Sequence, residues 1–237
     1  MIHFVGAGSG APDLITVRGQ KFLREADVVI YAGSLVNPEL LKETKPGCEI
    51  LNSAYMTLDE VIRAMEKAER EGKMTVRLHT GDPAIYGAIR EQMDRLEALG
   101  IPYEIVPGVS SFLGAAAALH AEYTLPGVSQ TVILTRMEGR TPVPEREGIR
   151  ALAAHQATMV IFLSVGQIRK LCEQLIPAYG ENTPAAAVYK ATWQDEKIVR
   201  ATLGTLAAEV EAAGITKTAL ILVGGFLGSD HELSKLY

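Results

Sequence analysis

The sequence predicts an α/β protein built from two domains. In the first half, short apolar runs alternate with segments of helical period, which is typical of a mostly parallel sheet with helices on both faces. The alternation stops around residues 120–130, and in the second half two apolar runs lie too close together for a parallel crossover. We therefore expect an N-terminal α/β domain at 1–119, a linker at 120–130 and a C-terminal α/β domain with a mixed sheet at 131–237.

The elements of the first domain follow from its apolar pattern. Thr57 and Glu60 form a capping box before a helical stripe that Gly72 ends. Further helices are expected at 13–26, 85–99 and 112–119. Short apolar runs predict strands at 2–5, 28–31, 49–51, 74–78 and 103–106.

The second domain has a different order of elements. A helix is expected from Ile168 and another at 204–213. Runs rich in β-branched and apolar residues predict strands at 131–135, 158–163, 185–189, 197–203 and 219–223. Because a parallel crossover needs about a dozen residues or more, the strands at 185–189 and 197–203 must be antiparallel.

Composition narrows the class of protein. Of the 237 residues 48% are hydrophobic and 22% charged, and no apolar run approaches the roughly 20 residues of a membrane span. The net charge of −5 argues against a nucleic-acid partner. Cys48 and Cys172 lie far apart and the five histidines show no ligand spacing, so no protein-bound metal is expected. The chain begins directly with a strand pattern, and we expect a cytoplasmic protein without a membrane partner.

The stretch His-Thr-Gly-Asp-Pro at 79–83 is the most informative motif. It follows a predicted strand, where open α/β sheets bind ligands. Gly81 lets the backbone approach a ligand, and the Asp82 carboxylate, with no cation beside it, suits a ligand that offers hydroxyls or an ammonium. The alternative is that Asp82 caps a helix whose first turn contains Pro83. A second loop, 107–111, is expected at the same sheet edge, so Ser110 and Ser111 should face a common crevice with Gly81 and Asp82.

A glycine-rich turn follows the first predicted strand. Gly6-x-Gly8-x-x-Ala11 matches the dinucleotide-binding fingerprint in its Gly/Ala form. However, the second strand ends in Tyr31 without the acidic residue that binds ribose, and Pro12 interrupts the entry to the helix. A plain bend between strand and helix, or an open loop shaping a larger cleft, are the alternatives to nicotinamide binding.

Four segments resemble the tetrapyrrole methylases. Residues 6–16 are similar to the N-terminal motif of that family, and 79–87 to its S-adenosylmethionine loop. Residues 134–144 and 188–197 look like one branch, the precorrin-4 C(11)-methyltransferases of corrin-ring synthesis. The resemblance runs from Ile2 to about Gly228. Gln194, where the branch is expected to carry Pro, and Ser9, where much of the family has Pro, are departures.

The resemblance implies an enzyme that uses S-adenosylmethionine as methyl donor and a tetrapyrrole or corrinoid as acceptor, in a two-domain fold that assembles as a homodimer. Precorrin-4 or its cobalt form is the expected acceptor. Alternatives are another tetrapyrrole methylase, for example one acting on uroporphyrinogen III, a nicotinamide-dependent oxidoreductase, or a non-catalytic sensor of the same ligand. By motif position the donor contacts are Gly81, Asp82, Ile85, Tyr86, Ser110, Ser111, Phe162, Leu163, Ala191, Thr192 and Ala219.

The acceptor carries several carboxylates, so cations are needed to bind it. Arg136 and Arg140 follow a predicted strand of the second half, and Lys190 ends another. Arg captures carboxylates through two hydrogen bonds, although these residues could also belong to a solvated face. We predict substrate binding by Pro12, Arg136, Arg140 and Lys190. No catalytic acid or base is assigned, because an electron-rich ring carbon can attack the methyl group without prior deprotonation.

Overall fold

The computed structural model describes residues 1–139 and 141–235. The chain divides into two compact units, Met1–Gly114 and Ala115–Tyr237, and the division falls within helix α4 (Ser111–Leu119). Within the described ranges, no helix combines the length and the apolar character that crossing a membrane requires. Each unit is built around its own five-stranded sheet.

The sheet of the first unit is parallel throughout, as the alternating pattern predicts. Its strand order is β3-β2-β4-β1-β5. β1 pairs with both β4 and β5, which brings the carboxyl ends of three strands to one edge. The strands are β1 (Ile2–Gly6), β2 (Val28–Tyr31), β3 (Glu49–Asn52), β4 (Thr75–His79) and β5 (Tyr103–Val106).

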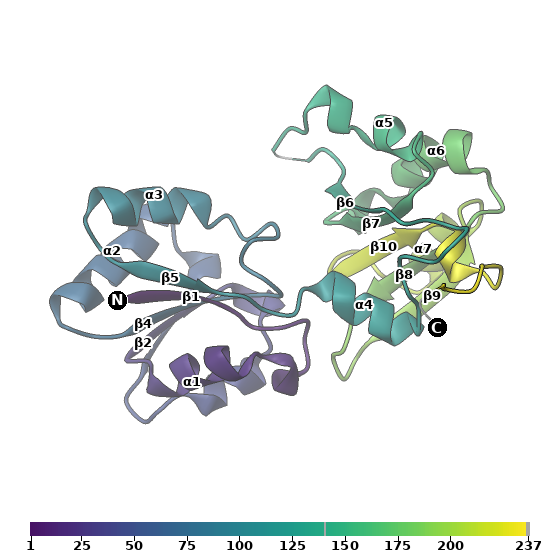
Figure 1. The fold of residues 1–237 in the computed structure, drawn as a ribbon. Coiled ribbons are helices and arrows are strands. Elements are labelled where there is room, and N and C mark those ends of the chain that lie inside the picture. The colour runs from purple at the N-terminus through teal and green to yellow at the C-terminus, as the bar shows by residue number, and fades with distance from the viewer. Residues whose placement is uncertain (140, 236–237) are drawn as a thin grey trace. The chain divides into compact units, whose positions relative to one another are not determined.

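Helices cover both faces of this sheet (Figure 1). α1 (Val17–Glu25) packs Leu23 against one face, with Val5, Val29 and Leu78 of the strands. α2 (Leu58–Arg70) and α3 (Arg90–Ala98) pack on the other face, with Phe4 and Ile30. The Thr57–Glu60 capping box is present, so the predicted start of α2 is confirmed.

Two predicted helix starts are wrong. The segment predicted as a helix at 13–26 opens with a 3-10 turn at Pro12–Leu14, and α1 begins only after Thr16, whose hydroxyl accepts the Gly19 N–H at 3.2 Å. The helix predicted from residue 85 begins at Arg90 instead. Tyr86 and Ala88 have φ values of 55° and 49°, and a right-handed helix cannot form through such residues.

The sheet of the second unit is mixed, as predicted. Its order is β6-β7-β10-β8-β9, with β6 and β7 parallel and the other neighbours antiparallel. The predicted antiparallel pairing of the strands at 185–189 and 197–203 is confirmed. The strands are β6 (Val132–Arg136), β7 (Thr158–Phe162), β8 (Pro184–Tyr189), β9 (Lys197–Thr202) and β10 (Ala219–Val223).

Three helices of the second unit pack into one apolar cluster on this sheet. α6 (Ile168–Tyr179) and α7 (Leu206–Ala212) correspond to the predicted helices, and α5 (Ile149–Ala153) was not predicted. A helix of five residues is too short to show a period in the sequence. Residues 121–131 contain neither helix nor strand.

Candidate functional site

Three loops at the carboxyl edge of the first sheet are joined through their backbones. A Cβ on Gly6 would lie 2.6 Å from Gly108 Cα and from the Gly81 carbonyl oxygen, and one on Gly108 would lie 2.2 Å from that oxygen. The Gly81 N–H donates to the Gly8 carbonyl at 2.9 Å. Only glycine leaves room for such a close approach of three chain segments. The structure therefore brings together the loops that follow β1, β4 and β5.

Asp82 ties two of these loops to each other. Its Oδ1 accepts the Ala84 N–H at 2.8 Å, and its Oδ2 accepts the Gly108 N–H at 2.8 Å. The alternative that Asp82 caps the next helix is wrong, because that helix begins only at Arg90. Each carboxylate oxygen retains a second lone pair that could accept a ligand hydroxyl or amino group. The donor contact predicted for Asp82 stays a prediction.

The other predicted residues of the first unit lie on the same three loops or at the start of α4. A Cβ on Gly81, whose φ is 58°, would be 3.4 Å from Ser110 Cα and from the Ser111 nitrogen. Ser110 is buried, and Ser111 begins α4. Tyr86 is 45% exposed, and Ile85 beside it is half-buried. Pro12 begins the 3-10 turn after the glycine-rich loop.

Two basic side chains are buried on one face of β4. Arg77 donates to Gln92 Oε1 at 3.0 Å and to the Ile30 carbonyl at 3.1 Å, and burial lowers its pKa to about 10. Burial, together with the charge of Arg77, lowers the pKa of His79 to about 3. His79 Nε2 has no hydrogen-bond partner among the described residues. His79 is therefore neutral at pH 7, which agrees with a role in ordering the loop rather than in carrying protons.

The glycine-rich loop lacks the geometry that dinucleotide binding requires. In that fold the pyrophosphate lies at the N-terminus of a helix that opens directly from the glycines. Here the 3-10 turn Pro12–Leu14 intervenes, and α1 starts at Val17. No helix opens directly from these glycines to bind a pyrophosphate, so the structure does not support the nicotinamide interpretation.

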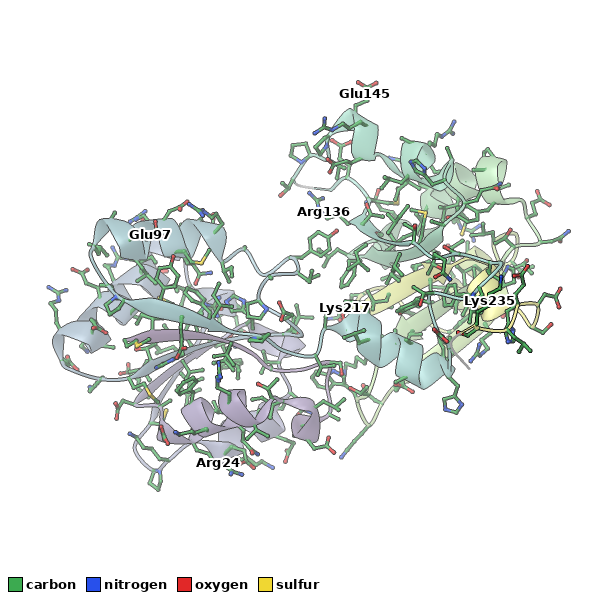
Figure 2. All side chains as sticks on the ribbon, in the orientation of Figure 1. Arg24, Glu97, Arg136, Glu145, Lys217 and Lys235 are labelled. Atoms are coloured by element: carbon green, nitrogen blue, oxygen red, sulfur yellow. The ribbon has the colours of Figure 1, made fainter. Side chains whose placement is uncertain are left out.

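The predicted residues of the second unit meet at one edge of its sheet. Arg136 pairs with Phe162 in parallel register, so the ends of β6 and β7 are adjacent. β10 runs antiparallel to β7 and β8, and its first residue, Ala219, pairs with Tyr189. Figure 2 shows Arg136 and Lys217, which precedes β10, at this edge. The same edge carries the predicted residues Phe162, Leu163, Lys190, Ala191, Thr192 and Ala219.

Four non-glycine residues at this edge have left-handed backbones. Leu163, Lys190, Thr192 and Thr218 have φ values of 54°, 47°, 69° and 57°. Leu163 is also 69% exposed. Left-handed residues cost energy and gather at ligand sites, so their grouping here favours this edge as a binding surface.

Both described cations predicted for substrate binding make contacts within the chain. Lys190 Nζ lies 2.6 Å from Asp195 Oδ2 and 4.9 Å from the centre of the Trp193 ring, and the Asp195 hydrogen bond raises the lysine pKa. The Arg136 guanidinium donates to the carbonyls of Met137, Thr141 and Pro142 at 3.0–3.1 Å. Arg140 lies outside the described residues.

Sequence reasoning missed several polar residues of this edge. Ser164 and Gln167 hold the loop after β6, and Lys217 is an exposed cation next to Thr218. Ser164 directly follows the predicted strand 158–163, and position after a strand end is the signal that singled out the other loops. Nothing in the sequence marks Lys217, because lysines before strands are common on protein surfaces.

The two edges differ in the chemical groups that each could offer a ligand. The first edge offers a carboxylate, serine hydroxyls and glycine backbone, without an exposed cation among the predicted contacts, which suits hydroxyls and an ammonium. At the second edge the exposed Leu163 offers apolar surface to a ligand, and Phe162, Ala191 and Ala219 are buried beside it. In the described part of the chain, no three His, Cys, Asp or Glu side chains gather as a metal site.

Comparison with known proteins gives the family. The family model for tetrapyrrole (corrin/porphyrin) methylases matches residues 1–207. The chain is 58% identical, over all of its length and 92% of the relative's, to a cobalt-precorrin-4 C(11)-methyltransferase of Methanocaldococcus jannaschii.

Two solved structures agree with this match. The X-ray structure of a cobalamin biosynthetic enzyme, cobalt precorrin-4 methyltransferase, has 53% identity and a TM-score of 0.94, with 96% of each chain covered. A Thermus thermophilus uroporphyrin-III C-methyltransferase complexed with S-adenosyl homocysteine has 28% identity and a TM-score of 0.79, with 95% of this chain and 92% of that chain covered. This chain belongs to the tetrapyrrole (corrin/porphyrin) methylases.

Proposed function

We propose that the protein transfers a methyl group from S-adenosylmethionine to C-11 of precorrin-4 or cobalt-precorrin-4. The observation that carries this proposal is the 58% identity, over the whole chain, to a relative named for that reaction. It is supported by the residues at 134–144 and 188–197, which resemble the same branch. The cobalt ion would belong to the substrate, held by the nitrogens of the macrocycle.

We propose that residues at each of the two sheet edges contact the methyl donor. A donor bound there supplies a methyl group on a sulfonium, and the chain must hold it about 3 Å from the attacking carbon with the orbitals aligned. Asp82 accepts hydrogen bonds from hydroxyl or amino groups, and Leu163, which is 69% exposed beside the buried Phe162 and Ala191, presents apolar surface. Support comes from the relative complexed with S-adenosyl homocysteine. None of these residues acts as an acid or base in this scheme.

Direct acceptor binding is proposed for Arg140 and Lys190 of the second unit and for Pro12. Lys190, whose ammonium is held by Asp195 and by the Trp193 ring, presents a fixed positive charge to a substrate carboxylate. Assembly as a homodimer, implied by the family resemblance, and residence in the cytoplasm, expected from the sequence, are further proposals.

Calorimetry and turnover assays test the proposal in two steps. The protein should bind S-adenosylhomocysteine and not NADH, which separates a methylase from the oxidoreductase alternative. With S-adenosylmethionine present, mass spectrometry should then detect one added methyl group on precorrin-4 or its cobalt form, and none on uroporphyrinogen III. Methylation of uroporphyrinogen III alone would refute the acceptor, and donor binding without turnover of any acceptor would favour a sensor.

A further inference from the structure

The loop that follows β6, which spans residues 137–144 and is described at 137–139 and 141–144, is shaped by the residue just before it. Arg136 Nη1 donates to the carbonyls of Met137 at 3.1 Å and Thr141 at 3.0 Å, and Nη2 donates to the carbonyl of Pro142 at 3.1 Å. Three of the five guanidinium N–H groups are thus used on the backbone of one loop. The guanidinium draws together the two ends of this loop.

A second set of contacts fixes the same loop to the turn after β7. The buried hydroxyl of Ser164 accepts the Met137 N–H at 2.8 Å and donates to the Phe162 carbonyl at 2.7 Å. Gln167 Nε2 donates to the Glu138 carbonyl at 3.0 Å. Because β6 and β7 are parallel neighbours, these bonds hold the start of the loop to the turn that contains Leu163.

The three hydrogen bonds of Arg136 depend on the planar shape of the guanidinium more than on its charge, because all three acceptors are neutral carbonyls. No carboxylate of the described residues lies within ion-pair distance of Arg136. A planar fork can reach several carbonyls at once, whereas a lysine ammonium is a single point on a flexible stem. The sequence-based expectation that Arg136 binds a substrate carboxylate does not account for these three bonds.

We propose that Arg136 is a positioning residue that determines acceptor binding by shaping the 137–144 loop and, through Ser164, its register against the Phe162–Leu163 turn. This inference rests on the proposed function, because it assigns the loop to the acceptor. Arg136 then acts on the tetrapyrrole through the loop, and a carboxylate of the acceptor is bound elsewhere.

Matched arginine substitutions test the proposal. Arg136→Lys keeps the charge and Arg136→Ala removes it, and the same two changes at the exposed Arg146 serve as controls. Both Arg136 variants should speed hydrogen exchange in peptides covering 137–144 and raise the acceptor KM about tenfold or more, because displacements of about 1 Å can cost a hundredfold in rate. The dissociation constant of S-adenosylhomocysteine should stay within about twofold, as should all values for the Arg146 variants.

Ser164→Ala gives a second route to the same result, since it removes the acceptor of the Met137 N–H. It should also speed exchange in 137–144. Wild-type exchange in both Arg136 variants would overturn the proposal, as would an Arg136→Lys enzyme with wild-type acceptor KM, which would mean that charge alone matters. Absence of turnover in the wild-type protein would instead refute the proposed function, while the exchange measurement would still decide whether Arg136 shapes the loop.

Discussion

At the scale of single residues, Asp82 and His79 have different tasks within one loop. Asp82 uses both carboxylate oxygens to connect the loops after β4 and β5. His79 ends β4 as a buried neutral ring. The sequence indicated that both matter, but it could not supply the partner of Asp82, because Gly108 is 26 residues away and donates through its backbone.

Asp82→Asn tests whether the carboxylate binds the donor. An asparagine offers one acceptor oxygen instead of two, so one backbone N–H loses its partner and fewer lone pairs face a ligand. We expect affinity for S-adenosylhomocysteine to fall by about 1.5–3 kcal/mol in calorimetry. Asp94→Asn, an exposed change in α3, should leave the affinity unaltered. An unchanged affinity in Asp82→Asn would show that Asp82 serves the loop junction alone.

His79 should make the stability of the fold depend on pH. The unfolded chain takes up a proton at this residue near pH 6.5, whereas the folded protein resists it down to about pH 3. The unfolded state therefore binds more protons in this window, and the free energy of unfolding falls as the pH falls through it. This residue should contribute a loss of about 2 kcal/mol between pH 7 and pH 5. Urea unfolding of the wild type and of His79→Asn should show a smaller pH dependence in the variant, and equal dependence would contradict the assignment.

At the scale of elements, apolar periodicity was sufficient to predict the strands. Together with the spacing between strands, it also predicted that the first sheet is parallel and the second mixed. It failed where single residues adopt left-handed backbones. Because Tyr86 and Ala88 have positive φ values, α3 begins only at Arg90, although the side chains from residue 85 already show a helical period. Neither Tyr nor Ala is a residue type that predicts a left-handed backbone. The short helix α5 was missed because five residues cannot show a period.

The glycine junction of the first unit gives a test at this scale. In Gly108→Ala the new Cβ would lie 2.2 Å from the Gly81 carbonyl oxygen and 2.7 Å from Gly6 Cα, and backbone atoms have little room to move. We expect a loss of about 1–3 kcal/mol or more in the free energy of unfolding. In Gly139→Ala no atom of the described residues, apart from the chain neighbours, lies within 4 Å of the new Cβ, so stability should change by no more than about 0.5 kcal/mol. Equal stabilities of the two variants in urea would contradict the close approach.

At the scale of the whole molecule, each unit gathers its predicted residues at one edge of its own sheet. The first unit brings together Gly81, Asp82 and Ser110, and the second brings together Phe162, Lys190 and Ala219. Strand-end position was enough to predict the first grouping, whereas Phe162 and Ala219 of the second were implied by the family resemblance. The contacts that occupy Arg136 and Lys190 could not be predicted, because they depend on loop carbonyls and on Asp195.

The most direct test of the proposed function is the position of the methyl group in the product. The protein should be incubated with S-adenosylmethionine carrying a ¹³C-labelled methyl group and with precorrin-4, in parallel with and without cobalt. NMR of the purified product should place the label on C-11 in at least one of the two reactions. A label on another ring carbon, or no label in either reaction although calorimetry shows the donor bound, would contradict the account.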